Sequence, residues 1–247
     1  MRVMHTVEVV MVFAIGATTA YADGLFCNLP KDGTWATYQF DSSVSHGQYG
    51  VQTVKGTIRM ASVGAVTENG QPCRWIEVAM EPQFEKGTAP PGGGTKQVIK
   101  VLIPEKFLAK GETPLDHAIR AWKWAKGEGE PEKMKDLRDP DDAPIHVILS
   151  GPLKDAKQLP KAEVEGKLGE LLCEGVTGSL ELKLSGGATF RYVLENRMHR
   201  RAPFGIVTSR WTETIVKGYK GAGSKQEWNL KLIDFGENAK SEMPGAK

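Results

Sequence analysis

The sequence predicts a mainly β protein, built as one large antiparallel sheet of about ten strands with a helical insertion in the middle of the chain. Three observations lead to this prediction. Apolar and polar residues alternate over much of the chain, which is the period of a strand with one buried face. Turn-forming residues join these segments at short range, as they do between antiparallel neighbours. The chain also lacks the regular succession of strands and helices that builds a parallel sheet.

Period-2 segments indicate strands from near the beginning of the chain to its end. The clearest segment places Leu180, Leu182 and Leu184 on one face, with polar residues between them on the other. Together these segments predict nine or ten strands. Segments with this pattern, clear or weak, cover 35–40, 51–63, 76–80, 97–103, 145–150, 180–184, 190–198, 206–216 and 228–232.

Short turns connect several of these segments. Asn69-Gly70 is the pair that favours a type I′ hairpin, because both central residues of that turn need a positive φ. The glycine-rich segment 185–187 offers a second hairpin tip, and 90–94 forms a longer proline- and glycine-rich connection. Consecutive strands are therefore expected to lie side by side.

A helix is expected over 113–126, within an insertion that extends to about residue 142. It begins with a capping threonine and a proline, and Leu115, Ile119 and Trp122 follow at helical spacing. Trp124 lies about 200° around such a helix from Trp122, so one apolar surface cannot bury both tryptophans.

Residues 1–22 are expected to form a signal peptide, and residues 23–247 a single mature domain. An apolar run over 9–15 leads to a small-x-small triplet, so cleavage between Ala22 and Asp23 would export the protein to the periplasm or out of the cell. The alternative is an N-terminal core helix. No later stretch approaches the roughly 20 apolar residues of a membrane span, so no transmembrane segment is expected after cleavage.

Composition and spacing exclude several function classes. The 32 basic and 30 acidic residues nearly cancel, so no nucleic-acid partner is expected. The histidines and acidic residues show no metal-ligand spacing, and no nucleophile elbow or phosphate loop is present. No catalytic, metal-binding or cofactor-binding residue is assigned, and the protein is not expected to be an enzyme.

Cys27, Cys73 and Cys173 allow two interpretations. An oxidising compartment permits one disulfide and a leftover thiol, without indicating which pair forms. Alternatively, the thiols are buried and act as small apolar side chains.

Three segments resemble exported proteins of the outer-membrane lipoprotein-carrier (LolA/LolB-like) superfamily: an opening strand, a hairpin followed by a Trp-x-Glu strand, and a bend between late strands. The resemblance implies a curved, half-open β-barrel whose concave face is plugged by helices. It also implies that this barrel holds acyl chains or a lipid-modified partner. The segments are Gly33-Thr34-Trp35-Ala36-Thr37-Tyr38, Asn69-Gly70-Gln71-Pro72-Cys73-Arg74-Trp75-Ile76-Glu77 and Arg201-Ala202-Pro203-Phe204-Gly205-Ile206-Val207.

One predicted helix is too little to cover so wide a sheet. Either the sheet closes on itself or an apolar cavity on its concave side stays partly open. The alternative for each candidate lining residue is ordinary core. The candidates for the cavity are Phe190, Tyr192, Leu194 and Trp211, with Trp122 on the covering helix and Trp124 near the mouth.

The densest basic cluster consists of Arg197, His199, Arg200 and Arg201. It is a candidate site for an anionic headgroup, bound through charge-assisted hydrogen bonds. It is equally suited to the charged end of a strand that discourages edge pairing.

The sequence thus favours an exported, non-catalytic protein that binds a lipid, an acyl chain or a lipoprotein in an apolar half-barrel cavity. The alternative is an interaction module of the cell envelope that has no ligand cavity.

Overall fold

The computed structural model describes residues 28–45, 51–84, 94–108, 111–139, 143–218 and 224–245. The signal peptide, its cleavage site and Cys27 lie outside the described residues, so export and a disulfide at Cys27 stay predictions. The strands are β1 (Trp35–Ser45), β2 (Val51–Glu68), β3 (Gln71–Gln83), β4 (Gln97–Pro104), β5 (Arg120–Ala125), β6 (Glu132–Lys133), β7 (Lys154–Gly166), β8 (Gly169–Lys183), β9 (Thr189–Met198), β10 (Ile206–Lys217) and β11 (Lys225–Gly236). The helical elements are short: η2 (Glu105–Leu108), η3 (Pro114–His117), α1 (Ala143–Ile148) and η5 (Ser185–Gly187).

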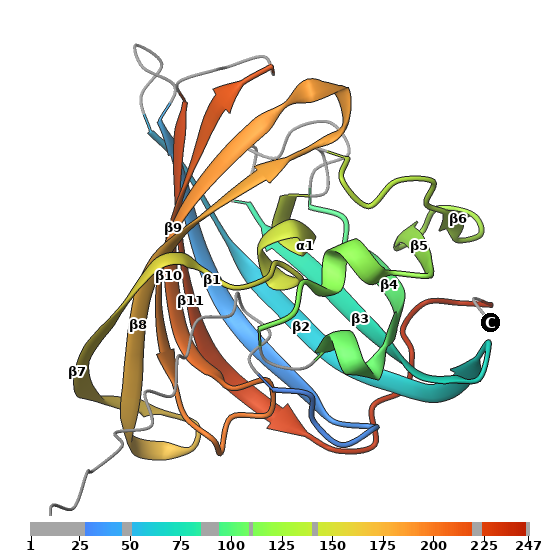
Figure 1. Cartoon of the computed structure of the whole chain (residues 1–247), viewed down its shortest axis with the longest axis horizontal. Helices are drawn as coiled ribbons and strands as arrows, with labels where there is room; N and C mark the ends of the chain where they lie inside the picture. Colours follow the sequence, from blue (N-terminus) through green and yellow to red (C-terminus); the bar gives the residue numbers. More distant parts are fainter. Residues whose placement is uncertain are drawn as a thin grey trace, which may run out of the picture.

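The eleven strands form one antiparallel sheet, which confirms the predicted fold class. Their order is β6-β5-β4-β3-β2-β1-β11-β10-β9-β8-β7, so each half of the chain is a meander and pairing of β1 with β11 joins the halves. The sheet is open at β6 and β7 and bends around α1, which lies on its concave side (Figure 1). The half-barrel expected from the resemblance has this arrangement.

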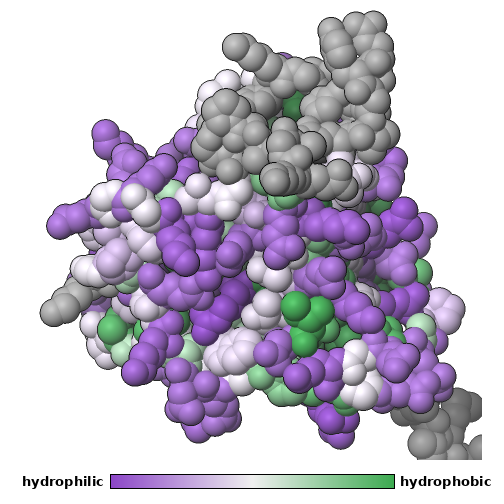
Figure 2. Space-filling view, turned by 180° about the vertical axis from the view of Figure 1, so that it is seen from behind, coloured by the Kyte–Doolittle hydropathy of each residue, from purple (hydrophilic) through white to green (hydrophobic). Residues whose placement is uncertain are grey.

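Alternation of side chains places the main core on the concave face. In β9 the buried positions are every second residue, as the period-2 pattern predicts. Ile145, Val147 and Ile148 of α1 join the same core and cover part of this face. Seen from behind, the molecule is mostly hydrophilic, with small apolar patches between polar side chains (Figure 2).

The hairpin between β2 and β3 forms as predicted. Asn69 and Gly70 have φ values of 49° and 73°, and Glu68 pairs with Gln71. These values are those of the left-handed region that a type I′ turn requires. The turn at Ser185–Gly187 likewise joins β8 to β9.

The helix predicted over 113–126 is wrong. Only Pro114–His117 is helical, as a single 3₁₀ turn, and Arg120–Ala125 forms strand β5, paired with β4. In a strand, residues two apart share a face, so Trp122 and Trp124 can pack on one surface, which a helix does not allow. No long helix therefore packs on the concave face between residues 113 and 139.

Two further segments differ from the prediction. The apolar run predicted as a strand at 145–150 includes most of helix α1, because periodicity alone does not separate short buried strands from short helices. Strand β7 was missed because most of its residues are polar and it has no long apolar alternation, although Val164 packs against the core.

Candidate ligand site

The predicted inner residues form a continuous aromatic layer on the concave face. Trp211 is paired with Leu194 on one side and with Trp228 on the other. The rings of Trp211 and Trp228 stack with centroids 5.4 Å apart and planes 10° apart. Phe190 and Tyr192 also lie against each other, with centroids 6.4 Å apart. The four predicted residues Phe190, Tyr192, Leu194 and Trp211 are at most 3% exposed.

A pocket of about 250 Å³ adjoins this layer at Trp228. None of the predicted residues lines this pocket. Trp211 does not contact it directly but stacks on Trp228, which does line it. A ligand contact for the four predicted residues stays a prediction. The apolar lining consists of Phe40, Val54, Met80, Pro82, Phe84 and Trp228, and the rest of Ser42, Gly94, Thr95, Gln97 and Gln226.

Local packing fixes the aromatic wall of this pocket. Phe40 lies across from Gly56, where an added Cβ would come within 2.7 Å of the ring. Glycine at this position therefore leaves room for the ring to lie over β2. On its other side the Phe40 ring meets the Trp228 ring, with centroids 5.4 Å apart.

Polar groups beside the pocket are only partly satisfied. Gln226 donates from Nε2 to the Ser42 hydroxyl at 2.6 Å. Among the described residues, the Trp211 and Trp228 indole nitrogens and the Tyr192 hydroxyl have no hydrogen-bond partner. Buried groups without partners are uncommon in folded proteins, and each calls for an explanation.

Glu213 lies on the same face, opposite Tyr192 on β9 and Gln226 on β11. Glu213 is 7% exposed. No described residue forms a hydrogen bond or an ion pair with its carboxyl group. Burial raises the pKa of Glu213 to about 7. Burial, followed by the charge of Glu213, raises the pKa of Tyr192.

Glu213 was not among the predicted site residues, although the sequence carries a signal for it. Trp211, Glu213 and Ile215 are spaced by two residues in a predicted strand. Alternation therefore places a carboxyl among apolar neighbours. An acidic residue on the apolar face of a strand is a marker of a polar site.

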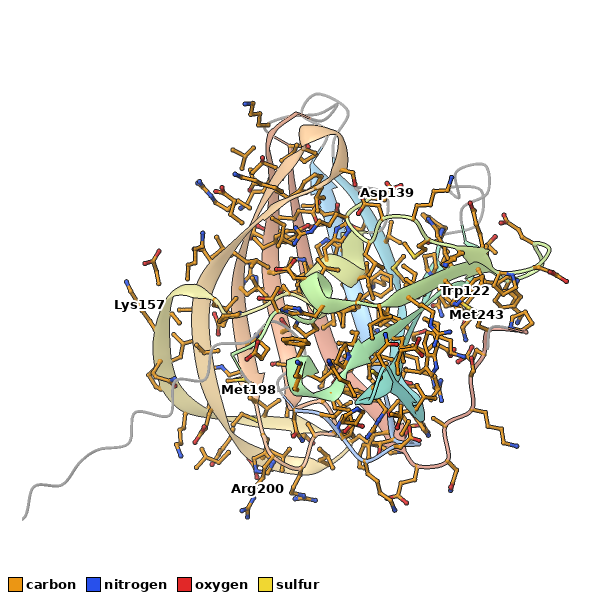
Figure 3. The ribbon with its side chains drawn as sticks, turned by 45° about the vertical axis from the view of Figure 1, so that its right-hand side comes forward. Trp122, Asp139, Lys157, Met198, Arg200 and Met243 are labelled. Carbon is orange, nitrogen blue, oxygen red and sulfur yellow. The ribbon has the colours of Figure 1, made fainter. Side chains whose placement is uncertain are left out.

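Trp122 and Trp124 do not join the inner layer. They pack on the outer face against the cluster of Ala79, Val98 and Met243, and Figure 3 shows Trp122 beside Met243. Since β5 is a strand whose Ala121 faces the inner core, the two tryptophans point to the other side. Their predicted place in the concave cavity is therefore wrong.

A second buried glutamate lies on this outer face. Glu77 is 1% exposed and accepts hydrogen bonds from the Ser241 hydroxyl at 2.6 Å and the Glu242 backbone N–H at 2.9 Å. Lys100 is paired with it across β3 and β4. Burial lowers the pKa of Lys100, and the charge of Glu77 opposes this effect. The C-terminal segment after β11 thus covers Glu77 on the outer face and supplies its hydrogen-bond donors.

The basic cluster is only partly assembled. His199 and Arg200 line a pocket of about 430 Å³ near the end of β9. Figure 3 shows Arg200 at the lower end of the molecule, below Met198, the last residue of β9. Arg197 instead donates to the Pro160 carbonyl at 2.6 Å, and Arg201 uses its backbone N–H to contact His199 Nδ1 at 3.2 Å. Anion binding at this cluster stays a prediction.

Several other features bear on the class of site. Within the described ranges, no group of three or more His, Cys, Asp or Glu side chains could hold a metal ion. The helices found there are all too short or too polar to cross a bilayer. Cys73 and Cys173 are buried, free thiols, so they are not paired with each other.

No family model and no curated protein matches the sequence. Among solved structures, the chain is similar to a DUF1329 family protein from Desulfovibrio piger, with 10% identity, 88% of each chain covered and a TM-score of 0.33. It is also similar to a LolA superfamily protein from Nitrosomonas europaea, with 8% identity, coverage of 90% of this chain and 91% of that chain, and a TM-score of 0.28. Because both TM-scores are low, we base the function on the residues of this chain alone.

Proposed function

We propose that this protein is an exported, non-catalytic binder of acyl chains, and that the chain of a lipid or lipid-modified partner enters the pocket beside Trp228. The observation that carries the proposal is the lining of that pocket. Six apolar side chains line a partly open pocket of about 250 Å³ next to the concave core. Each methylene transferred from water to such a site contributes about 0.8 kcal/mol.

The position of the pocket supports this function. Most of its lining comes from β1–β4 and β11, including the two strands that join the halves of the sheet, and Phe84, Gly94 and Thr95 lie between β3 and β4. The volume is slightly below the roughly 300–1,000 Å³ of typical small-molecule sites, so it suits one acyl chain or part of a chain better than a bulky ring system. The predicted signal peptide would export the protein to the periplasm or the cell exterior. There the exposed acyl chains of a partner are unfavourable in water and are stabilised by burial in an apolar pocket.

A thermal-shift titration with dodecanoic acid and dodecanol tests the proposal. Binding to the folded state must raise the melting temperature with ligand concentration. Val54 lines the pocket, and Val54→Phe is expected to fill it and abolish the shift. The neighbouring Thr53 is exposed on the other face of β2, so Thr53→Phe is the matched control and should keep the shift.

Two outcomes would overturn the proposal. The first is the absence of any shift with either amphiphile in the wild type, which would favour the interaction module. The second is an equal shift in the wild type and in Val54→Phe, which would place acyl binding elsewhere on the molecule.

A further inference from the structure

The inner face holds a carboxyl to which the described residues supply no hydrogen-bond or ionic partner. Glu213 is 7% exposed, and the two side chains opposite it, Tyr192 and Gln226, offer no positive charge. Gln226 directs its amide hydrogen to Ser42 instead. A buried carboxylate is strongly destabilising unless a counter-charge or hydrogen-bond donors compensate it.

The surroundings of Glu213 are aromatic. Trp211 is two residues away on the same strand and face, and its ring stacks on Trp228. Phe40 packs on the far side of Trp228. A carboxylate among aromatic residues is a combination that binds ammonium groups, because the negative charge and the ring quadrupoles both attract a cation.

The pocket lies next to this carboxyl. Gln226 and Trp228 line the pocket, and Gln226 is the residue directly opposite Glu213. Directly opposed residues of antiparallel strands have Cβ atoms only about 4.5–5.5 Å apart. A ligand whose chain fills the pocket can therefore bring a terminal group to Glu213.

We propose that the pocket selects amphiphiles carrying a protonated amine: the apolar chain packs between Phe40, Val54 and Met80, and the ammonium group pairs with the carboxylate of Glu213. The inference rests on the proposed function, since both concern the same pocket. An alkanol of equal length uses the same apolar lining but leaves Glu213 without a counter-charge.

Calorimetric titration with dodecylammonium and dodecanol, each below its micelle-forming concentration at pH 8, tests this selectivity. A hydrogen bond between charged groups predicts that the wild type binds the amine about ten- to a hundredfold more tightly than the alcohol. Glu213→Gln should remove this preference and leave dodecanol binding unchanged. Glu227→Gln changes the next glutamate on β11 beside Gln226, on the outer face, and should keep the preference.

Each other result decides against one proposal or both. Equal affinities for the amine and the alcohol in the wild type would overturn the ammonium site and leave acyl binding standing. A preference for the amine that survives in Glu213→Gln would also overturn it. Failure of both amphiphiles to bind would overturn the proposed function together with this inference.

Discussion

The two faces of the sheet each bury a glutamate beside tryptophans, but they satisfy it differently. On the outer face, Glu77 accepts two hydrogen bonds from the C-terminal segment and faces Lys100. On the inner face, Glu213 has no such partner among the described residues, and its pKa is raised to about 7. A buried acid that the fold satisfies is a structural element, whereas one that the fold leaves unsatisfied beside a pocket marks a binding site.

The largest expected difference between the faces concerns their tryptophans. Trp211 is 2% exposed in the inner layer, so Trp211→Ala is expected to lower the free energy of unfolding by about 3–5 kcal/mol. Trp124 is half-buried on the outer face, and Trp124→Ala should cost about 1 kcal/mol. Urea denaturation of both variants measures the difference. Equal losses would show that the outer face is as tightly packed as the inner one.

Neutralising the two glutamates should change stability in opposite directions. The folded state keeps the Glu213 proton up to about pH 7, while the unfolded chain releases it near pH 4.5, so stability is lost as the pH rises between these values. Glu213→Gln removes this loss, and at pH 8 it should raise the free energy of unfolding by up to about 3 kcal/mol. At pH 4 it should have no effect.

Glu77→Gln is the matched variant on the outer face. It leaves Lys100 without its facing negative charge, so at pH 8 it should lower the free energy of unfolding by about 1–3 kcal/mol. Denaturation curves of both variants at pH 4 and pH 8 test the pair. A destabilising effect of Glu213→Gln at pH 8 would mean that its carboxylate is already compensated in the folded protein.

A smaller effect is expected where the C-terminal segment meets Glu77. Ser241→Ala removes the hydroxyl that donates to the Glu77 carboxylate and should cost about 1 kcal/mol. Hydrogen exchange at the Glu242 backbone N–H, which donates to the same carboxylate, should become faster. Unchanged exchange would show that Met243 packing alone holds the segment in place.

The smallest effect is expected at the basic cluster. Arg200 is exposed beside the pocket at the end of β9, so Arg200→Ala should weaken binding to anionic vesicles only about twofold, and salt should remove the difference. Arg210→Ala, at an exposed position of β10, serves as the control. A loss of similar size in both variants would assign vesicle binding to net charge rather than to this cluster.

The inner layer could be predicted from the sequence because it depends on local alternation. Phe190, Tyr192 and Leu194 share a face in any strand, and the Asn69-Gly70 turn fixes the register of its hairpin. The outer position of Trp122 and Trp124 was not predicted, since pairing with β4 overrides the helical spacing of the residues before them.

The pocket itself could not be predicted from local patterns. Phe40, Val54, Met80 and Trp228 come from four strands, and only the successive pairing of β11, β1, β2 and β3 brings them together. Glu213 is the exception. Its place in an apolar alternation is visible in the sequence, but the lack of a partner emerges only when the neighbouring strands are in place.

Extraction of the natively purified protein with organic solvent, followed by quantitative mass spectrometry, tests acyl binding most directly. The wild type and Thr53→Phe should release acyl-chain lipid in amounts close to the molar amount of protein, and Val54→Phe should release little, because its pocket is filled. Absence of acyl lipid from the wild type, or equal amounts from wild type and Val54→Phe, would contradict acyl binding in this pocket.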